Sequence, residues 1–205
     1  ELLRSLFGID KMTSGELHVE GKNIEHISPK SMKSIGMGLT QEDRKNEGLV
    51  HTLSVSENLG LAGLSRYTKR FGFLNRKIES EMVDEQIDRL SIKIASKNDN
   101  VFSLSGGNQQ KVVIGNWLNM LPKIMLFDEP TRGIDVNAKQ QVFDIIWELS
   151  RQGVACIVVS SELEELLEIC HRILIMRYGE IVDEVMPEDT TIERLYTLCM
   201  GGSVN

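Results

Sequence analysis

The stretch VFSLSGGNQQKVVIGNWLNMLPKIMLFDEPTRGID, from Val101 to Asp135, contains two patterns that are typical of a phosphate site. A Ser-Gly-Gly turn opens a helical pattern, and the backbone N–H groups and dipole of a helix start favour an anion. Farther on, four apolar residues run into Asp128 and Glu129. Ligands of open α/β sheets bind at the carboxyl ends of strands, where such carboxylates hold Mg²⁺ through water or orient an attacking water.

Each pattern by itself has an ordinary structural explanation. The segment LSGGNQQ, 104–110, also fits a flexible helix start that Ser105 caps. The segment KIMLFDEP, 123–130, also fits an acidic turn after a buried strand. Nothing in the local sequence requires the glycine pair Gly106 and Gly107, although such a pair lowers helix stability. The interpretation as a phosphate site therefore depends on both patterns occurring together.

The composition limits the class of protein. The 205 residues are 41% hydrophobic and 26% charged, which is typical of a globular protein. The net charge of −7 argues against a broad nucleic-acid surface. No apolar run approaches the roughly 20 residues that span a bilayer, and no signal peptide is evident. The opening ELLRSLFGID lacks both Met and a helix cap, so we interpret the chain as a fragment cut inside a helix.

The cysteines and histidines predict no special chemistry. Cys156, Cys170 and Cys199 lack CxxC spacing, and we interpret them as buried thiols of a reducing compartment. The four histidines are scattered along the sequence and predict no metal site.

Strands alternate with helices over most of the sequence, which predicts an α/β fold with a mainly parallel sheet covered on both sides. The runs IMLF and ACIVV predict strands buried on both faces. Between Ser54 and Ile94 the pattern is helical, with one predicted apolar face made by Ile78, Met82, Val83, Ile87 and Leu90. The segment 41–50 reads as a charged loop. Helices are predicted at 1–8, 106–120, 137–151 and 162–169, and two more are predicted to start at Ser28-Pro29 and at Thr190. Strands are predicted at 36–40, 124–128, 154–159, 172–176 and 180–185. A hairpin turn is predicted at Glu20-Gly21.

LSGG, the strand ending in Asp-Glu-Pro, and TRGID together resemble the signature motif, Walker B strand and D-loop of ATP-binding-cassette (ABC) ATPases. The resemblance implies a P-loop NTPase-like core in one domain spanning 1–205, with a helical subdomain at about 55–103 and a small antiparallel β portion. It implies ATP and Mg²⁺ as ligands, with Asp128 at the metal through water and Glu129 as the catalytic carboxylate. Gly133 and Asp135 take the D-loop positions.

The finer pattern resembles the ATPase subunits of bacterial monosaccharide importers of the ribose, galactose and xylose type, which carry two cassettes in one polypeptide. The segments QEDRKNEGLV, 41–50, and SSELEELL, 160–167, match the second, C-terminal cassette. The Gly-rich loop of the Walker A motif is not in the sequence, and ELLRSLFG resembles the segment directly after that loop in these importers. We therefore expect a truncation just after the Walker A motif, with weak ATP binding and no turnover by the chain alone.

In this family two cassettes dimerise head to tail, and each ATP lies between one cassette's P-loop and the other's signature. The resemblance thus implies that Leu104, Ser105, Gly106, Gly107 and Gln109 close over ATP held by a companion N-terminal cassette. It also implies membrane permease subunits as partners, a periplasmic or lipid-anchored sugar-binding protein as an indirect partner, and no nucleic acid. The expected location is peripheral, at the cytoplasmic face of the bacterial inner membrane.

The sequence departs from the family pattern at two positions. Most cassettes have a Gln at the start of the loop that leads to the helical subdomain; here Gln41 and Glu42 are adjacent, and the spacing from Gly36 favours Glu42. Glu42 is thereby a second candidate for the metal. Most cassettes also have a His after the IVV strand, and here the position is Ser161. An uncharged hydroxyl stabilises transition-state charge less well, which predicts poor hydrolysis at this half's own site.

These patterns leave three classes of function. The first is the motor domain of a sugar importer, with nucleoside importers as near relatives. The second is a catalytically impaired regulatory cassette of the same kind of importer, which Glu42 and Ser161 favour and Glu129 opposes. The third is an ABC ATPase acting on nucleic acid or ribosomes; the acidic sequence disfavours it, and the span from Gly36 to Leu104 leaves no room for a long coiled coil.

Overall fold

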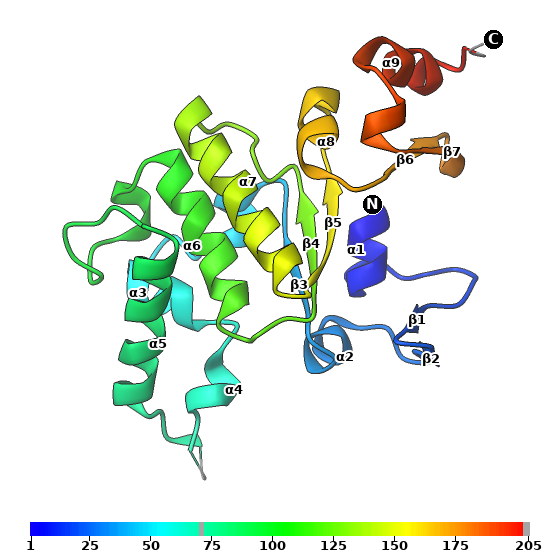
Figure 1. The fold of residues 1–205 in the computed structure, drawn as a ribbon. Coiled ribbons are helices and arrows are strands. Elements are labelled where there is room, and N and C mark those ends of the chain that lie inside the picture. Colours follow the sequence, from blue (N-terminus) through cyan, green and yellow to red (C-terminus); the bar gives the residue numbers. More distant parts are fainter. Residues whose placement is uncertain (70–71, 203–205) are drawn as a thin grey trace. The chain divides into compact units, whose positions relative to one another are not determined.

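The computed structural model describes residues 1–69 and 72–202. The chain divides into two compact units, Glu1–Ile157 and Val158–Asn205, with the division falling inside a strand. The predicted alternation of helices and strands is confirmed (Figure 1). The elements that begin in the first unit are α1 Leu2–Phe7, β1 His18–Val19, β2 Lys22–Asn23, α2 Pro29–Ser34, β3 Met37–Thr40, η1 Arg44–Gly48, α3 Val55–Gly60, α4 Leu64–Tyr67, α5 Arg76–Arg89, η3 Val101–Ser103, α6 Gly106–Leu118, β4 Ile124–Asp128, α7 Val136–Arg151 and β5 Ala155–Val159.

The central sheet of the first unit has the order β3-β4-β5, and β3 pairs with β4 in parallel from Met37↔Ile124 to Thr40↔Phe127. Figure 1 shows these strands between the pair α6–α7 and α1. Alternate residues of a strand face opposite sides of the sheet. Leu39 and Leu126 accordingly pack with the core residues of α1 and α2, whereas Gly38 leaves room for Trp117 of α6. The prediction of a sheet covered on both sides is confirmed for β3 and β4.

The prediction that β5 is buried on both faces is wrong. Exposure alternates along this strand, and Ile157 and Val159 are exposed while Cys156 and Val158 are half-buried. An apolar run such as ACIVV is compatible with one covered face as well as with two. The sequence pattern therefore could not distinguish the two arrangements.

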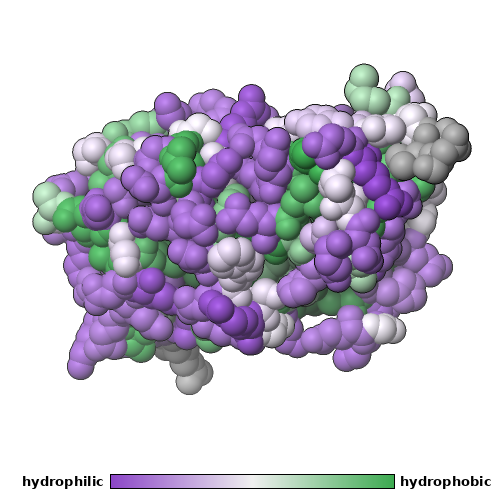
Figure 2. All heavy atoms as spheres, turned by 45° about the horizontal axis from the view of Figure 1, so that its top comes forward, coloured by the Kyte–Doolittle hydropathy of each residue, from purple (hydrophilic) through white to green (hydrophobic). Residues whose placement is uncertain are grey.

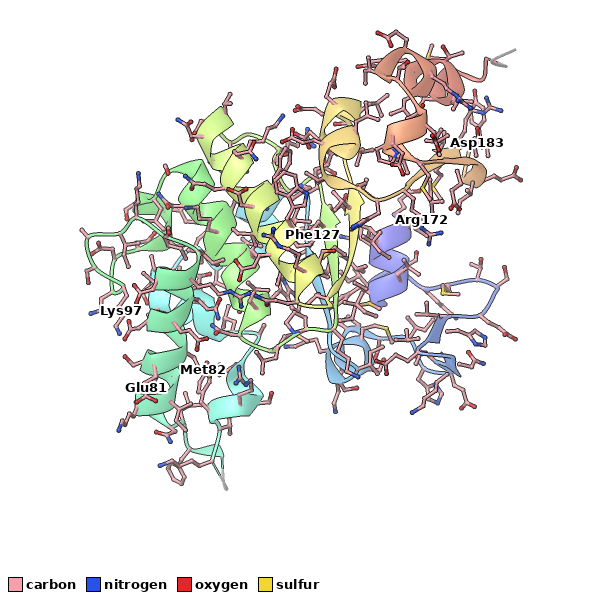
Figure 3. The ribbon with its side chains drawn as sticks, viewed as in Figure 1. Glu81, Met82, Lys97, Phe127, Arg172 and Asp183 are labelled. Carbon is pink, nitrogen blue, oxygen red and sulfur yellow. The ribbon has the colours of Figure 1, made fainter. Side chains whose placement is uncertain are left out.

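The described residues between Ser54 and Ile94 include the helices α3, α4 and α5, which confirms a helical segment. The predicted apolar face of α5 is partly wrong. Val83 is fully buried, but Ile78 is 39% exposed. The buried stripe instead includes Glu79 and Gln86, because a period of 3.6 residues aligns these positions with Val83. Figure 3 shows Met82 on the inner side of α5 and Glu81 pointing away from it.

A hydrogen bond from Arg76 compensates for the burial of the Glu79 carboxylate. Arg76 Nη1 donates to Glu79 Oε2 at 2.8 Å, which satisfies one oxygen of a side chain that rarely lies inside a protein. The buried Tyr67 hydroxyl lies nearby and donates to the carbonyl of Gly60 at 2.7 Å. Polar residues thus complete a core that the apolar pattern alone did not predict.

The second unit contains α8 Leu163–Ile169, β6 Ile173–Arg177, β7 Glu180–Val185, η4 Pro187–Asp189 and α9 Ile192–Met200. The strands β6 and β7 pair antiparallel and pack on α8 and α9 around a core of Ile173, Ile175, Val185 and Leu195. The predicted small antiparallel portion is thereby confirmed. Figure 3 labels Arg172, just before β6, and Asp183 in β7.

The cysteines are less buried than predicted. Cys156 and Cys170 are half-buried, and Cys199 is exposed. Burial raises the pKa of the Cys170 thiol to about 11, so this residue stays protonated at neutral pH. A fully apolar environment was expected because free cysteine is commonly buried, but α9 places Cys199 on its outer side.

Figure 2 shows that the face drawn is mostly hydrophilic, with separate hydrophobic spots. Over residues 1–69 and 72–202, no helix combines the length and the apolar character that a membrane span requires.

Candidate nucleotide site

Asp128 is the last residue of β4, directly after the fully buried Phe127 that Figure 3 labels. Its side chain is half-buried, and desolvation by this burial raises the pKa of the Asp128 carboxyl above its usual value. A carboxylate that is partly removed from water gains from a nearby cation. The environment of Asp128 thus fits a divalent metal ligand. Among the residues that the structure describes, no cluster of three or more His, Cys, Asp or Glu side chains forms a ready metal cage.

Glu129 begins a tight turn that leads from β4 to α7. Its φ is 46°, a left-handed conformation that non-glycine residues adopt at a cost of about 1–3 kcal/mol. The amide of Arg132 donates to the carbonyl of Glu129 at 3.1 Å, and Gly133 continues the turn with φ 68°. Asp135 then caps α7, because its Oδ1 accepts a bond from the amide of Ala138 at 3.0 Å.

Ser105 precedes α6 but does not cap it through its side chain. Its Oγ instead lies 3.1 Å from Asn108 Nδ2, which donates to it, and the residue is exposed. Ser105 thus takes the N-cap position of α6, where its carbonyl accepts from the Gln109 amide at 2.9 Å, but the side-chain cap that the alternative explanation expected is not formed. An exposed hydroxyl at a glycine-rich helix start is the kind of group that contacts an anion.

The glycine pair is required by residues that are distant in sequence, which agrees with the expectation that nothing local requires it. A Cβ on Gly107 would lie 2.4 Å from the Cβ of Ala138 in α7, and one on Gly106 would lie 3.1 Å from the carbonyl oxygen of Gly133. The start of α6 thus packs directly on the turn and on α7. The contact joins segments that are about thirty residues apart, so the local sequence could not reveal it.

Gln109 lies inside α6 and is 5% exposed. Its Nε2 donates to the carbonyl of Leu104 at 3.1 Å, and its buried Oε1 has no hydrogen-bond partner within the described part of the chain. The side chain therefore holds the residue before the Ser-Gly-Gly turn.

The segment 41–50, expected to be a charged loop, contains the π-helical turn η1. Asp43 starts the turn, because its Oδ1 accepts bonds from the amides of Lys45 and Asn46 at 3.2 and 3.1 Å. Gln41 Nε2 donates to Glu47 Oε2 at 3.1 Å, and the carboxylate of Glu42 forms an ion pair with Arg132. The side chains of both candidates, Gln41 and Glu42, are thus bonded within this region.

Arg44 is the residue that sequence reasoning missed. Its Nη1 donates to the carbonyl of Arg132 at 2.6 Å and its Nη2 donates to that of Gly133 at 3.0 Å. Desolvation lowers the pKa of the guanidinium below its usual value. An arginine in a charged segment gives no sequence signal of such a contact, which spans nearly ninety positions.

The structure thus brings three segments together, 41–48, 104–107 and 128–135, which we call the junction. Ser161 lies in the second unit, where it is exposed. Beside it, Ser160 Oγ donates to Glu165 Oε2 at 2.8 Å. The role predicted for Ser161 stays a prediction.

Comparison with known proteins supports the expected family. A family model described as ABC transporter matches residues 1–132. The ribose import ATP-binding protein RbsA of Bacillus subtilis (strain 168) is 43% identical over 202 residues, which are 98% of this chain and 41% of that protein. The arabinose import ATP-binding protein AraG of Pectobacterium atrosepticum is 39% identical over 200 residues, 98% of this chain and 39% of that protein. The chain therefore spans about two fifths of the length of these relatives.

Solved structures have the same fold at lower identity. A dimeric, post-hydrolysis form of the ATP-binding cassette MJ0796, bound to ADP and Pi, superposes with a TM-score of 0.77 at 22% identity, covering 91% of this chain and 79% of that one. The structure of cbiO1 from Clostridium perfringens gives a TM-score of 0.75 at 22% identity, covering 96% and 76%. These similarities confirm the predicted ABC ATPase fold.

Proposed function

The chain belongs to the ABC transporter family, and from this premise we propose that it is an ATP-binding and ATP-hydrolysing cassette of an importer. One observation carries the proposal: the glycine start of α6 packs on the turn that directly follows Asp128 and Glu129. A helix start that binds anions and two carboxylates at a strand end are both parts of phosphoryl-transfer sites. We assign them to two ATP sites: the carboxylates to the site of this cassette and the helix start to the site of a companion cassette.

Asp128 and Glu129 would have different roles in ATP hydrolysis. Asp128 would hold Mg²⁺ through water, and burial, which raises the pKa of this carboxyl, makes a bound cation more favourable there. Glu129 would orient and deprotonate the attacking water, and the left-handed backbone fixes the direction in which its side chain leaves β4. Bound Mg²⁺ would supply charge neutralisation at the phosphates.

The signature segment would act on ATP held by a second cassette. The exposed Ser105 hydroxyl is not used to cap its own helix, which supports a role toward a ligand outside the chain. Gly106 and Gly107 would let the backbone approach the phosphates closely. Leu104 and Gln109 would support this turn from behind, since the Gln109 amide holds the Leu104 carbonyl. A companion cassette is accordingly part of the proposal.

The cargo and the partners are inferred from the relatives. The two relatives described above are named as import ATP-binding proteins for ribose and for arabinose, which are both pentoses. We therefore assign a monosaccharide as the transported compound, with a sugar-binding protein as an indirect partner. Residues 55–103 would form the helical subdomain that docks on membrane permease subunits. The exposed side chains of Leu64, Phe73 and Ile78 supply apolar surface for such a contact. The cassette would thus lie peripherally on the cytoplasmic face of the membrane.

A regulatory role for this half's own site is the second candidate. Glu42 occupies the position favoured for the metal-contacting Gln, and its carboxylate is paired with Arg132. Ser161 stands where a charged or ring side chain is expected. Both support weak hydrolysis at this half's own site, while the signature would still serve the companion's site.

Turnover by the assembled transporter that contains this sequence tests the proposal. Ser105→Ala removes the hydroxyl proposed to face the phosphates, so ATP hydrolysis should fall at least tenfold. Ser103→Ala is the matched control, because the Ser103 hydroxyl donates to the Asn100 carbonyl at 2.7 Å, away from the turn. The control should retain wild-type turnover within a factor of two. Equal activity of the two variants would contradict a signature role for Ser105 and favour a purely structural cassette.

A further inference from the structure

Arg44 connects all three segments of the junction. Its two terminal nitrogens donate to consecutive carbonyls, those of Arg132 and Gly133, so the planar guanidinium binds the backbone of the turn as a fork. On its other side lies the start of α6, where a Cβ on Gly106 would come within 2.8 Å of Nη2. Glycine at 106 thus gives the guanidinium the space that it occupies.

The ion pair between Glu42 and Arg132 is a weaker link between two of these segments. Glu42 pairs with Arg132, but both side chains are more than half exposed, and exposed ion pairs contribute little. Arg44 is half-buried and its charged guanidinium makes two bonds to carbonyls, and charge-assisted bonds of this kind are stronger than bonds between neutral groups. Its Nε is buried and has no hydrogen-bond partner among residues 1–69 and 72–202.

We propose that Arg44 is a positioning residue that fixes the turn 131–134 and the glycine start of α6 in one geometry. The proposal rests on the proposed function, because that geometry would place the Ser-Gly-Gly turn against ATP held by the companion cassette. The segment 41–48 leads from β3 toward the helical subdomain. Arg44 would therefore link the signature geometry to the segment that leads to that subdomain.

The first readout of Arg44→Lys is catalytic and uses the assembled transporter. Lysine keeps the charge but cannot donate to two carbonyls as a planar fork. We expect kcat for ATP hydrolysis to fall about tenfold with KM for ATP within twofold, because ATP is bound mainly by the other cassette. Arg194→Lys is the control: Arg194 Nη1 donates to the single carbonyl of Asp189 at 3.2 Å, in the second unit. Its kcat and KM should match the wild type.

The second readout is hydrogen–deuterium exchange of the same proteins without nucleotide. Arg44→Lys should exchange at least threefold faster in 104–110 and 131–135, with the melting temperature within about 3 °C of the wild type. Unchanged exchange in both segments would overturn the proposal. The proposal would also be overturned if Arg194→Lys lost kcat to the same extent. It would likewise be overturned if the kcat loss of Arg44→Lys came with a comparable fall in its melting temperature.

The two proposals fail in different ways. If Ser105→Ala leaves turnover unchanged, the proposed function is wrong, whatever exchange shows. If Ser105→Ala abolishes turnover while Arg44→Lys changes neither kcat nor exchange, the function stands and the role of Arg44 is wrong.

Discussion

The junction and the helical region 55–103 are stabilised by different kinds of contact. In the junction, side chains bond to backbone carbonyls far along the chain, as Arg44 does with Arg132 and Gly133. The helical region has such a bond too, from Arg66 Nη1 to the carbonyl of Asn119 at 2.8 Å, but it also contains caps and ion pairs. Ser54 and Glu57 form a capping box, and Lys97 Nζ lies 2.6 Å from Asp84 Oδ1.

This difference in contacts indicates which of the two regions holds its backbone atoms in fixed positions. Long-range contacts to a backbone hold its atoms in place, whereas caps and ion pairs stabilise helices without fixing their neighbours closely. Substitutions in the junction should therefore have larger effects than those in the helical region, and the effects should depend more on shape than on charge.

The largest effect is expected from Phe127→Ala in β4, at the residue directly before the junction segment 128–135. Phe127 is fully buried, so its truncation should lower the free energy of unfolding by about 3–5 kcal/mol. Ile78→Ala on α5 is the contrasting change, at an exposed position of the helical region, and it should cost less than about 0.5 kcal/mol. Urea titration of both variants measures the difference. A cost for Ile78→Ala similar to that of Phe127→Ala would mean that the apolar face first predicted for α5 is buried after all.

An intermediate effect is expected from adding one methyl group at the junction. Gly107→Ala should cost about 1–3 kcal/mol, because the new Cβ would overlap that of Ala138. The double variant Gly107→Ala with Ala138→Gly restores the space and should recover the cost, apart from about 1 kcal/mol for glycine in α7. A double-mutant cycle by urea titration tests this coupling. Additive costs would show that the two helices do not meet there as described.

The smallest effect is expected from the cap of α3. Ser54→Ala removes the hydroxyl that accepts from the amide of Glu57 at 3.2 Å and should cost about 1 kcal/mol. Ser56→Ala, two residues later and inside the helix, should change stability by less than about 0.5 kcal/mol. Thermal unfolding of both variants gives the comparison. A loss for Ser54→Ala as large as that for Gly107→Ala would remove the contrast between the two regions.

The same cap gives stability a pH dependence. The amide of Ser54 is the main cause that holds the pKa of the Glu57 carboxyl below its usual value of 4.5. For an acid with a lowered pKa in the folded state, the stabilisation is present above pH 4.5 and is lost as pH falls through the lowered value. The stability difference between the wild type and Glu57→Gln, measured by urea titration across this pH range, should therefore narrow in acid.

Much of the fold could be predicted from the sequence because it depends on local patterns. The apolar run before Asp128 predicts β4, and Ser28-Pro29 predicts the start of α2, which has Ser28 as its cap. The Ser54–Glu57 spacing was an available signal of the cap. The side of α5 that faces the core was harder to predict, because it includes Glu79, whose buried carboxylate accepts a hydrogen bond from Arg76.

The candidate site also has residues that the sequence could predict and residues that it could not. Asp128, Glu129 and the glycine pair could be placed because each lies at the end or start of a predicted element. The need for Gly107 depends on Ala138, and the role of Arg44 depends on a turn that begins nearly ninety residues later. Contacts of this kind arise from the folded backbone, and a single sequence gives no measure of them.

The pairing of Met37 with Ile124 has a consequence for how the chain reaches its native state. The whole helical region lies between these two strands, so their ends meet only after a long loop has closed. Pairing across such a separation is slow, whereas α3 and α5 are close in sequence and can associate early. Asp128 and Glu129 would therefore acquire their surroundings last, and under the proposed function a newly made cassette would remain unable to act on nucleotide until its sheet is complete.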